Sequence, residues 1–273
     1  MIERIIPASG NTIPVIGLGT WSTFDVGGTS AYPVLKEVLQ TMHTCGGRLI
    51  DSSPMYGRAE KVIGDITSGM QARDDFFYAT KVWITGKEDG IRQMETSMSL
   101  MRRKKIDLMQ IHNLLDWKIH FQTLRKWKEE GRIKYIGITH YTDSFHQELE
   151  RVLGMKKFDF VQFNYSVLSC NAEKRLLPAC KDMGVATIIN RPFGEGNLFS
   201  IVKNRSLPDW ASEIGIKTWS EFFLKYIISH AGVTCVIPAT RQPLHAVANM
   251  AAGEGELPDE KHRKKMVEYL EKI

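Results

Sequence analysis

Eight short apolar runs, separated by segments with helical periodicity, are the feature of this sequence that most restricts its fold. The runs are Val15–Gly17, Leu49–Ile50, Phe77–Thr80, Leu108–Ile111, Tyr135–Ile138, Phe160–Phe163, Ala186–Ile189 and Cys235–Ile237. Between the runs, apolar residues recur every three to four positions, as in Leu35, Val38, Leu39 and Met42, which places them on one helical face. Alternating strands and helices predict parallel strands joined by helical crossovers. Eight such units predict an α/β protein with a closed (β/α)8 fold, the TIM barrel.

Two segments lie outside this repeat. Residues 2–16 contain two short apolar runs around Ser9, Gly10 and Asn11, which predicts an N-terminal β-hairpin that caps the bottom of the barrel. The segment from Arg191 to Ser212 is rich in glycine and proline and is too long for a plain connector. No linker divides the chain, so residues 1–273 are expected to form a single barrel domain.

Charge and cysteine usage exclude several classes of protein. The net charge is +5, but the 36 basic and 31 acidic residues are intermixed, which argues against a nucleic-acid-binding surface. The densest basic cluster, Arg102 to Lys105, falls where a helix should end, and attraction to the helix dipole explains it. The four cysteines lie far apart without metal-ligand spacing to histidine, so we expect buried thiols and no metal site.

Hydropathy gives no sign of a membrane segment. No apolar run approaches the roughly 18 residues that span a bilayer, and no basic region followed by an apolar stretch marks the N-terminus. We therefore expect no membrane contact, a cytoplasmic location, and a monomer or weak oligomer. A periplasmic location would apply if an export signal had been removed.

Polar residues end the second, third and fourth apolar runs. Asp51 follows Leu49–Ile50 with Tyr56 in the same loop, Lys81 follows the third run, and His112 follows the fourth. In a (β/α)8 barrel the active site lies at the carboxyl ends of the strands. The side chains of these four residues are therefore expected to converge at one mouth.

The four residue types suit proton donation. A tyrosine has a pKa of about 10 and is a weak acid unless a cation stabilises its phenolate. Lys81 is the expected cation and should bring the pKa of Tyr56 down into the working range. Asp51 should keep the buried Lys81 charged, and His112 should orient a carbonyl group or share the proton.

Each of these residues also has an ordinary structural explanation. Alone, Asp51 would be a helix cap or turn residue, His112 a core histidine, Lys81 a surface lysine and Tyr56 a packing residue in a turn. Four such residues at consecutive strand ends favour a site. A barrel aldolase with Lys81 as a Schiff-base nucleophile is an alternative, which an Asp51 ion pair would disfavour.

Longer motifs carry a family resemblance over nearly the whole chain. They are IGLGTW at Ile16 to Trp21, LIDSSPMYGRAEKVIG at Leu49 to Gly64, TKVW at Thr80 to Trp83 and IDLMQIHN at Ile106 to Asn113. The chain resembles the aldo-keto reductase family, of a bacterial type with a short C-terminal region. The resemblance implies that Asp51, Tyr56, Lys81 and His112 form a catalytic tetrad. It also implies hydride transfer from NADPH, or less often NADH, to an aldehyde or ketone.

The resemblance further implies a set of cofactor contacts. Gln162, in FDFVQFNY with Asn164, matches the residue that holds the nicotinamide carboxamide. The helix that opens after the eighth strand corresponds to a phosphate site at a helix N-terminus. The implied contacts are Gly19, Thr20, Trp21, Thr139, His140, Gln162, Asn190, Arg191, Pro192, Gly194, Gly196, Asn197, Pro238, Ala239, Thr240, Arg241, His245 and Asn249.

Several of these positions depart from the usual family pattern. Thr139 and His140 stand where many relatives have Ser-Asn, which alters the contact to the carboxamide. Asn190 stands where an aromatic residue stacks on the nicotinamide in better known relatives. Arg241 is expected to bind the 2′-phosphate of NADPH, and His245 stands where many relatives have arginine. We expect NADPH to be preferred over NADH.

Aromatic and apolar residues are expected around the same mouth. Trp21, Met55, Trp83, Trp117 and Tyr141 lie in loops that should line a pocket for a small carbonyl substrate. The departures at His140 and Asn190 also leave a second function open, in which the chain is a nicotinamide-binding redox sensor or regulatory subunit with little turnover.

Overall fold

The centre of the molecule is a ring of eight parallel strands. The computed structural model describes residues 1–273, and the strands follow one another in chain order around the sheet. They are β3 (Leu18–Gly19), β4 (Leu49–Asp51), β5 (Phe77–Val82), β6 (Ile106–His112), β7 (Ile133–Thr139), β8 (Phe160–Asn164), β9 (Ala186–Asn190) and β10 (Cys235–Val236). Parallel bridges from Ile16 to Val236 and from Gly19 to Ala239 join the first and last strands. The predicted (β/α)8 barrel is therefore confirmed.

Glycines allow the first strand of the barrel to approach both of its neighbours closely. A Cβ atom at Gly17 would lie 2.8 Å from the carbonyl oxygen of Leu49, and one at Gly19 would lie 2.9 Å from that of Ile237. Any side chain at these positions would push the first strand away from its neighbours. The first strand pairs with β4 at Leu18 and Gly19, slightly later than the predicted Val15–Gly17.

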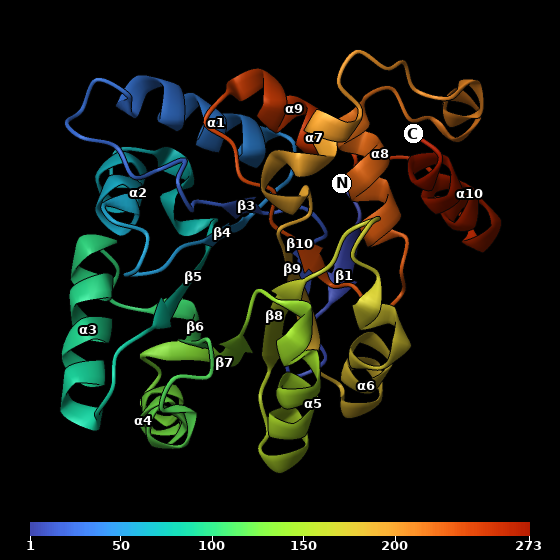
Figure 1. Cartoon of the computed structure of the whole chain (residues 1–273). Coiled ribbons are helices and arrows are strands. Elements are labelled where there is room, and N and C mark those ends of the chain that lie inside the picture. The colour runs from blue at the N-terminus through green and yellow to red at the C-terminus, as the bar shows by residue number, and fades with distance from the viewer.

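Helices surround the strands on the outside (Figure 1). They are α1 (Tyr32–Thr44), α2 (Ala59–Thr67), α3 (Lys87–Leu100), α4 (Trp117–Glu129), α5 (His146–Met155), α6 (Leu176–Met183), α7 (Asn197–Ile201), α8 (Trp219–Ile228), α9 (Pro243–Ala251) and α10 (Glu260–Glu271). The apolar stripe predicted for the first helix is buried, since Leu35, Val38, Leu39 and Met42 of α1 all pack inward. No helix combines the length and apolar character that a membrane crossing requires.

The N-terminal hairpin fills one end of the barrel. Strands β1 (Glu3–Ile5) and β2 (Thr12–Pro14) pair antiparallel, as predicted. Ile6, just after β1, and Ile13 of β2 are buried in one cluster with residues in the first half of the barrel strands, among them Leu49 and Leu108. The hydroxyl of Tyr135 binds the hairpin through Ser9 Oγ at 2.6 Å. The amino-terminal end of the barrel is thus closed by apolar packing.

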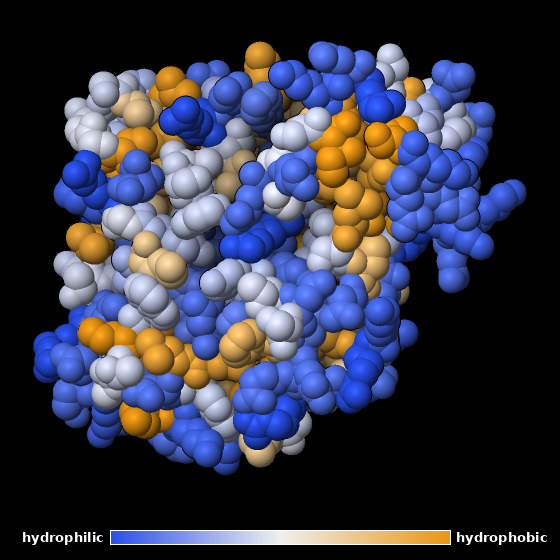
Figure 2. Space-filling model, viewed as in Figure 1, coloured by the Kyte–Doolittle hydropathy of each residue, from blue (hydrophilic) through white to orange (hydrophobic).

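The long segment after β9 has structure of its own. Residues Gly194–Gly196 form a short 3-10 turn, α7 follows directly, and another 3-10 turn spans Asp209–Ile214. Figure 2 shows mostly hydrophilic residues on the face seen in Figure 1, with apolar residues gathered in patches, one of them over α7 and α8. Phe199 of α7 is 40% exposed.

Candidate active site

The predicted polar residues lie at the carboxyl ends of three neighbouring strands. Asp51 pairs with Ala79 on β5, Lys81 with Gln110 on β6, and His112 with Thr139 on β7. Asp51 and His112 are the last residues of their strands, and Lys81 is the penultimate residue of β5. The strands run one or two residues further than predicted, so the hydrogen-bonded ladder itself fixes these backbone positions.

Lys81 and Asp51 form a buried ion pair. The Lys81 Nζ atom lies 2.7 Å from Asp51 Oδ2 and also donates to the Ser52 carbonyl oxygen at 2.7 Å. Burial alone would lower the pKa of Lys81, but Asp51 and Tyr56 outweigh it, and the pKa is raised above its ordinary value. A lysine held in its charged form is a poor nucleophile, which argues against the aldolase alternative.

Two glutamines satisfy the second oxygen of Asp51. Gln110 Nε2 donates to Asp51 Oδ1 at 3.0 Å, and Gln162 Nε2 donates to the same atom at 2.9 Å. Both glutamines are buried. The sequence interpretation missed Gln110. Gln110 could have been identified because it lies two positions before His112, and residues two apart on a strand face the same side.

Tyr56 lies against the ammonium group of Lys81. The Nζ atom is 4.9 Å from the centre of the Tyr56 ring, as the sequence interpretation required. However, the pKa of Tyr56 is raised, because burial outweighs the opposing charge of Lys81 and Asp51 adds to the increase. The expectation that Lys81 would bring this pKa below its ordinary value was therefore wrong for this structure. The phenol keeps its proton at neutral pH.

His112 packs against Tyr56, and its Nδ1 atom contacts a buried serine. Its ring packs edge-on to Tyr56 and tilted to Trp83, each at 6.1 Å between ring centres. The Ser53 Oγ atom lies 3.1 Å from His112 Nδ1, a contact that no sequence pattern signalled. Burial and the positive charge of Lys81, with a smaller contribution from His140, lower the pKa of His112 to about 3. The imidazole is therefore neutral at physiological pH.

A second polar group adjoins this quartet at the ends of β7, β8 and β9. Thr139 Oγ1 donates to Gln162 Oε1 at 3.2 Å, and Asn190 Nδ2 donates to the His140 carbonyl oxygen at 3.2 Å. The Asn190 Oδ1 atom is buried without a hydrogen-bond partner. The His140 ring stacks on the Phe145 ring with 3.6 Å between the ring centres. Burial and nearby positive charge lower the pKa of His140 to about 4.

The segment after β9 supplies a shallow groove. Arg191, predicted to contact phosphate, pairs with Glu195 at 2.8 Å and lies 4.3 Å over the Tyr141 ring. Arg191, Gly194 and Glu195 line a hollow of about 180 Å³ together with Tyr141 and residues that follow β8. Pro192 leads into this turn, Gly196 closes it with φ +94°, and Asn197 begins α7.

The predicted residues between β10 and α9 lie beside the end of β3. Pro238 accepts a backbone hydrogen bond from Gly19, Ala239 forms a bridge to Gly19, and Thr20 Oγ1 donates to the Asp51 carbonyl oxygen. Thr240 Oγ1 accepts from the backbone of Gln242 at 3.1 Å.

The beginning of α9 itself is open to solvent. No side chain caps the helix, and Arg241 and His245 are exposed. Asn249 is buried, and its Oδ1 accepts from Ser220. The structure therefore presents an arginine and free helical N–H groups together.

Four of the five predicted pocket residues are large side chains left partly exposed. Trp21, Met55, Trp83 and Tyr141 are between 39% and 48% exposed. Trp117 differs, because it begins α4 and lines an outer groove with Phe121 and Met155. It makes no ring contact with the quartet, and its place in the pocket stays a prediction.

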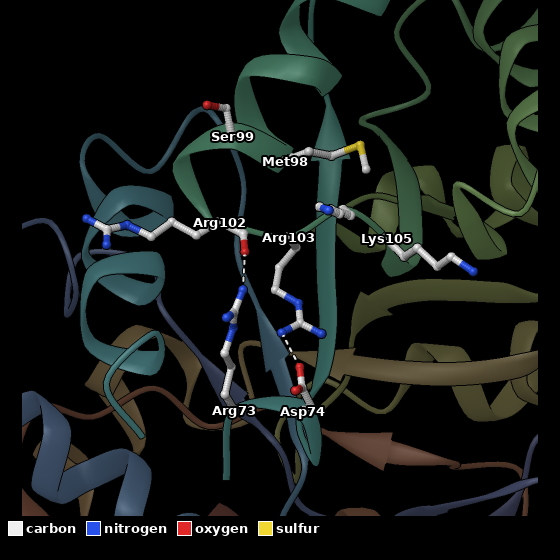
Figure 3. Close-up of a pocket in the computed structure, with 8 residues that line it drawn as sticks. Arg73, Asp74, Met98, Ser99, Arg102, Arg103 and Lys105 are labelled. Atoms are coloured by element: carbon white, nitrogen blue, oxygen red, sulfur yellow. Dashed lines mark hydrogen bonds and ion pairs between the residues drawn. The ribbon is translucent and has the colours of Figure 1, made fainter. Parts of the chain in front are cut away.

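A larger hollow lies elsewhere and does not resemble an active site. It measures about 610 Å³ and is lined by Arg73, Asp74 and the Arg102 to Lys105 cluster, just after α3. Figure 3 shows Arg73 bonded to the Arg102 carbonyl oxygen and Arg103 paired with Asp74. Arg102 pairs with Asp65. The arginines are therefore engaged within the protein.

Comparisons with known proteins agree with the barrel fold and indicate the family. Residues 15–266 match the model of the Aldo/keto reductase family. A methylglyoxal reductase of Escherichia coli is 28% identical over 94% of this chain and 92% of its own length. An NADH-specific methylglyoxal reductase of the same species is 26% identical over 79% and 74%. A crystal structure of an aldo/keto reductase from Klebsiella pneumoniae with NADP and acetate superimposes with a TM-score of 0.84 at 22% identity, covering 99% of this chain and 96% of that one.

Proposed function

The chain belongs to the aldo/keto reductase family and is an NAD(P)H-dependent oxidoreductase, and we propose that it reduces small aldehydes and ketones with Tyr56 as proton donor. The observation that carries the proposal is the contact of Tyr56 with the buried Lys81–Asp51 pair, beside a neutral His112. This group lies at the carboxyl ends of neighbouring strands, where barrel enzymes have their active sites.

Each residue of the quartet has a part in the proton transfer. Tyr56 donates its phenolic proton to the carbonyl oxygen, which becomes the hydroxyl oxygen of the alcohol. Lys81 stabilises the phenolate that remains, and Asp51 keeps Lys81 charged. With a pKa of about 3, His112 is neutral at neutral pH and cannot act as the acid. Its remaining N–H group serves as a hydrogen-bond donor to the same oxygen.

The residues present fit a nicotinamide cofactor. Asn190 Oδ1 is a buried acceptor without a partner beside Gln162 and Thr139, which suits the amide hydrogens of a carboxamide. The uncapped start of α9 with the exposed Arg241 suits a phosphate. When bound, the cofactor supplies the hydride that reduces the carbonyl carbon. We propose NADPH as the preferred form because Arg241 is exposed beside this helix start.

The test replaces the proton donor. Tyr56→Phe should lower kcat on a panel of small carbonyls, beginning with methylglyoxal, by a factor on the order of 10² or more, while the Kd for NADPH stays nearly unchanged. Tyr32→Phe is the matched control, because its hydroxyl binds Asp65 on the outer helices. Unchanged turnover in Tyr56→Phe would remove Tyr56 from this role. Tight cofactor binding by the wild-type protein without turnover on any carbonyl would favour the redox sensor instead.

A further inference from the structure

The hydroxyl of Ser53 is placed between His112 and a backbone amide. Ser53 is fully buried in the loop that follows β4. Its Oγ atom lies 3.1 Å from His112 Nδ1 and accepts a hydrogen bond from the Met55 backbone N–H at 3.2 Å. The Nε2 atom of His112 has no hydrogen bond within the protein, and the ring lies between Tyr56 and Trp83.

Counting hydrogens decides the direction of the contact between Ser53 and His112. A serine hydroxyl has one hydrogen and two acceptor positions, and the Met55 N–H occupies one acceptor position. If Nδ1 carried the imidazole hydrogen and donated to Oγ, the Ser53 hydrogen would be buried without a partner, which is costly. If Ser53 donates to Nδ1, every polar hydrogen in this contact is satisfied, and the imidazole hydrogen lies on Nε2.

We propose that Ser53 is a positioning residue that holds neutral His112 in the tautomer with its hydrogen on Nε2, ready to donate to the substrate carbonyl oxygen. The role in turnover rests on the proposed function, whereas the tautomer does not. The wrong tautomer would present a lone pair on Nε2 to the carbonyl oxygen, and the two acceptors would repel each other. Fixing the second nitrogen is the general way in which proteins choose the reactive nitrogen of a histidine.

The experiment reads the tautomer directly. Protein labelled with 15N-histidine is studied by NMR, and the His112 ring signals are identified by their loss in His112→Gln. In the wild-type protein, Nε2 should be the protonated nitrogen and Nδ1 the bare one. Ser53→Ala should shift the population toward hydrogen on Nδ1, and Ser53→Thr, which keeps the hydroxyl, should restore the wild-type tautomer. Ser97→Ala is the matched control, because Ser97 is a buried serine that donates to Glu60 on the outer helices.

Kinetics then connect the tautomer to turnover. Ser53→Ala should lower kcat/KM roughly tenfold, below the loss typical for removing a whole oxyanion donor, with the Kd for NADPH unchanged. Ser97→Ala should keep the wild-type kcat/KM. Ser53→Thr should recover most of the loss.

The two proposals fail in different ways. Hydrogen on Nδ1 in the wild-type protein, or an unchanged tautomer in Ser53→Ala, would overturn the role of Ser53 even if the protein reduces carbonyls. A wild-type protein without turnover would overturn the proposed function, and the NMR result would still decide the tautomer.

Discussion

Tyr56 is surrounded by groups that act on its proton in opposite directions. Burial and the charge of Asp51 raise its pKa, and the Lys81 ammonium lowers it. The net increase means that the phenol carries its proton at neutral pH, which is the form that reduction of a carbonyl consumes. The charge of Lys81 matters most when the proton leaves and a phenolate forms in a buried site.

Removing Lys81 should therefore affect both turnover and stability. In Lys81→Met, kcat should fall by a factor on the order of 10² or more, since the phenolate loses its cation. The free energy of unfolding should fall by about 3–5 kcal/mol, because Asp51 is left as an uncompensated buried charge. Steady-state kinetics and urea denaturation measure the two effects.

Lys61→Met is the control for this substitution. Lys61 is exposed and forms an i,i+4 ion pair with Asp65 on α2, so both quantities should stay close to wild type. Full turnover in Lys81→Met would show that Tyr56 does not need the cation.

At the scale of elements, strand periodicity explains how the polar residues meet. Alternate residues of a strand face the same side, so Leu108, Gln110 and His112 of β6 share one face. Leu108 packs in the apolar cluster against the hairpin, Gln110 binds Asp51, and His112 reaches Ser53. Three inward-facing residues of one strand thus extend from the apolar end of the barrel to its polar end.

The start of α9 should decide the choice between NADPH and NADH. NADPH differs from NADH by a 2′-phosphate, and Arg241 stands free at an uncapped helix start. Arg241→Ala should weaken NADPH binding roughly tenfold, as expected for loss of one charge-assisted contact of about 1.4 kcal/mol, and leave NADH binding nearly unchanged. Fluorescence titration with both cofactors measures this.

Arg205→Ala gives a control for the loss of an exposed arginine, since Arg205 lies near α10 and bonds to the Ile273 carbonyl oxygen. If Arg241→Ala weakened the binding of NADPH and NADH equally, Arg241 would not contact the 2′-phosphate. Tighter binding of NADH than NADPH by the wild-type protein would contradict the proposed preference.

At the scale of the whole molecule, the interior of the barrel is divided between an apolar end and a polar end. Ile6 and Ile13 of the hairpin close the apolar end. The polar end buries Lys81, Asp51 and His112. A buried histidine of this kind makes stability depend on pH, because its folded pKa of about 3 lies far below its ordinary value of 6.5.

The sign of the pH dependence follows from proton binding. Above pH 6.5, His112 is neutral in both states; between pH 6.5 and about 3 the unfolded state binds a proton there and the folded state does not. The free energy of unfolding should therefore fall as pH falls, by at most about 1.4 kcal/mol per pH unit from this residue. His112→Gln should reduce that slope in urea denaturation series.

The control must remove a buried polar contact that involves no titrating group. Because Ser53 binds His112 itself, the slope is compared with that of Thr187→Val, which removes a buried hydroxyl bonded to the Gly232 carbonyl oxygen and should lower stability at every pH without changing the slope. Equal slopes in wild type and His112→Gln would show that the histidine is not held neutral in the folded protein.

Much of the fold could be predicted because its signals are local. A short stretch of sequence is enough to recognise a strand by its apolar residues or a helix by its apolar face. All eight strands appear within a few residues of the predicted runs. Family motifs drew attention to Asp51, Tyr56, Lys81 and His112, and the structure brings Lys81 within contact of both Asp51 and Tyr56, with the His112 ring packed beside Tyr56.

The sequence by itself determined the order of strands and helices and the polar residues that end the strands, because periodicity and spacing are properties of short segments. Only the tertiary structure decided which atoms those residues contact and how easily they ionise. Ser53 and His112 are 59 positions apart, and Gln162 and Asp51 are 111 apart. The raised pKa of Tyr56 has the same origin, since burial is set by every element packed around the residue.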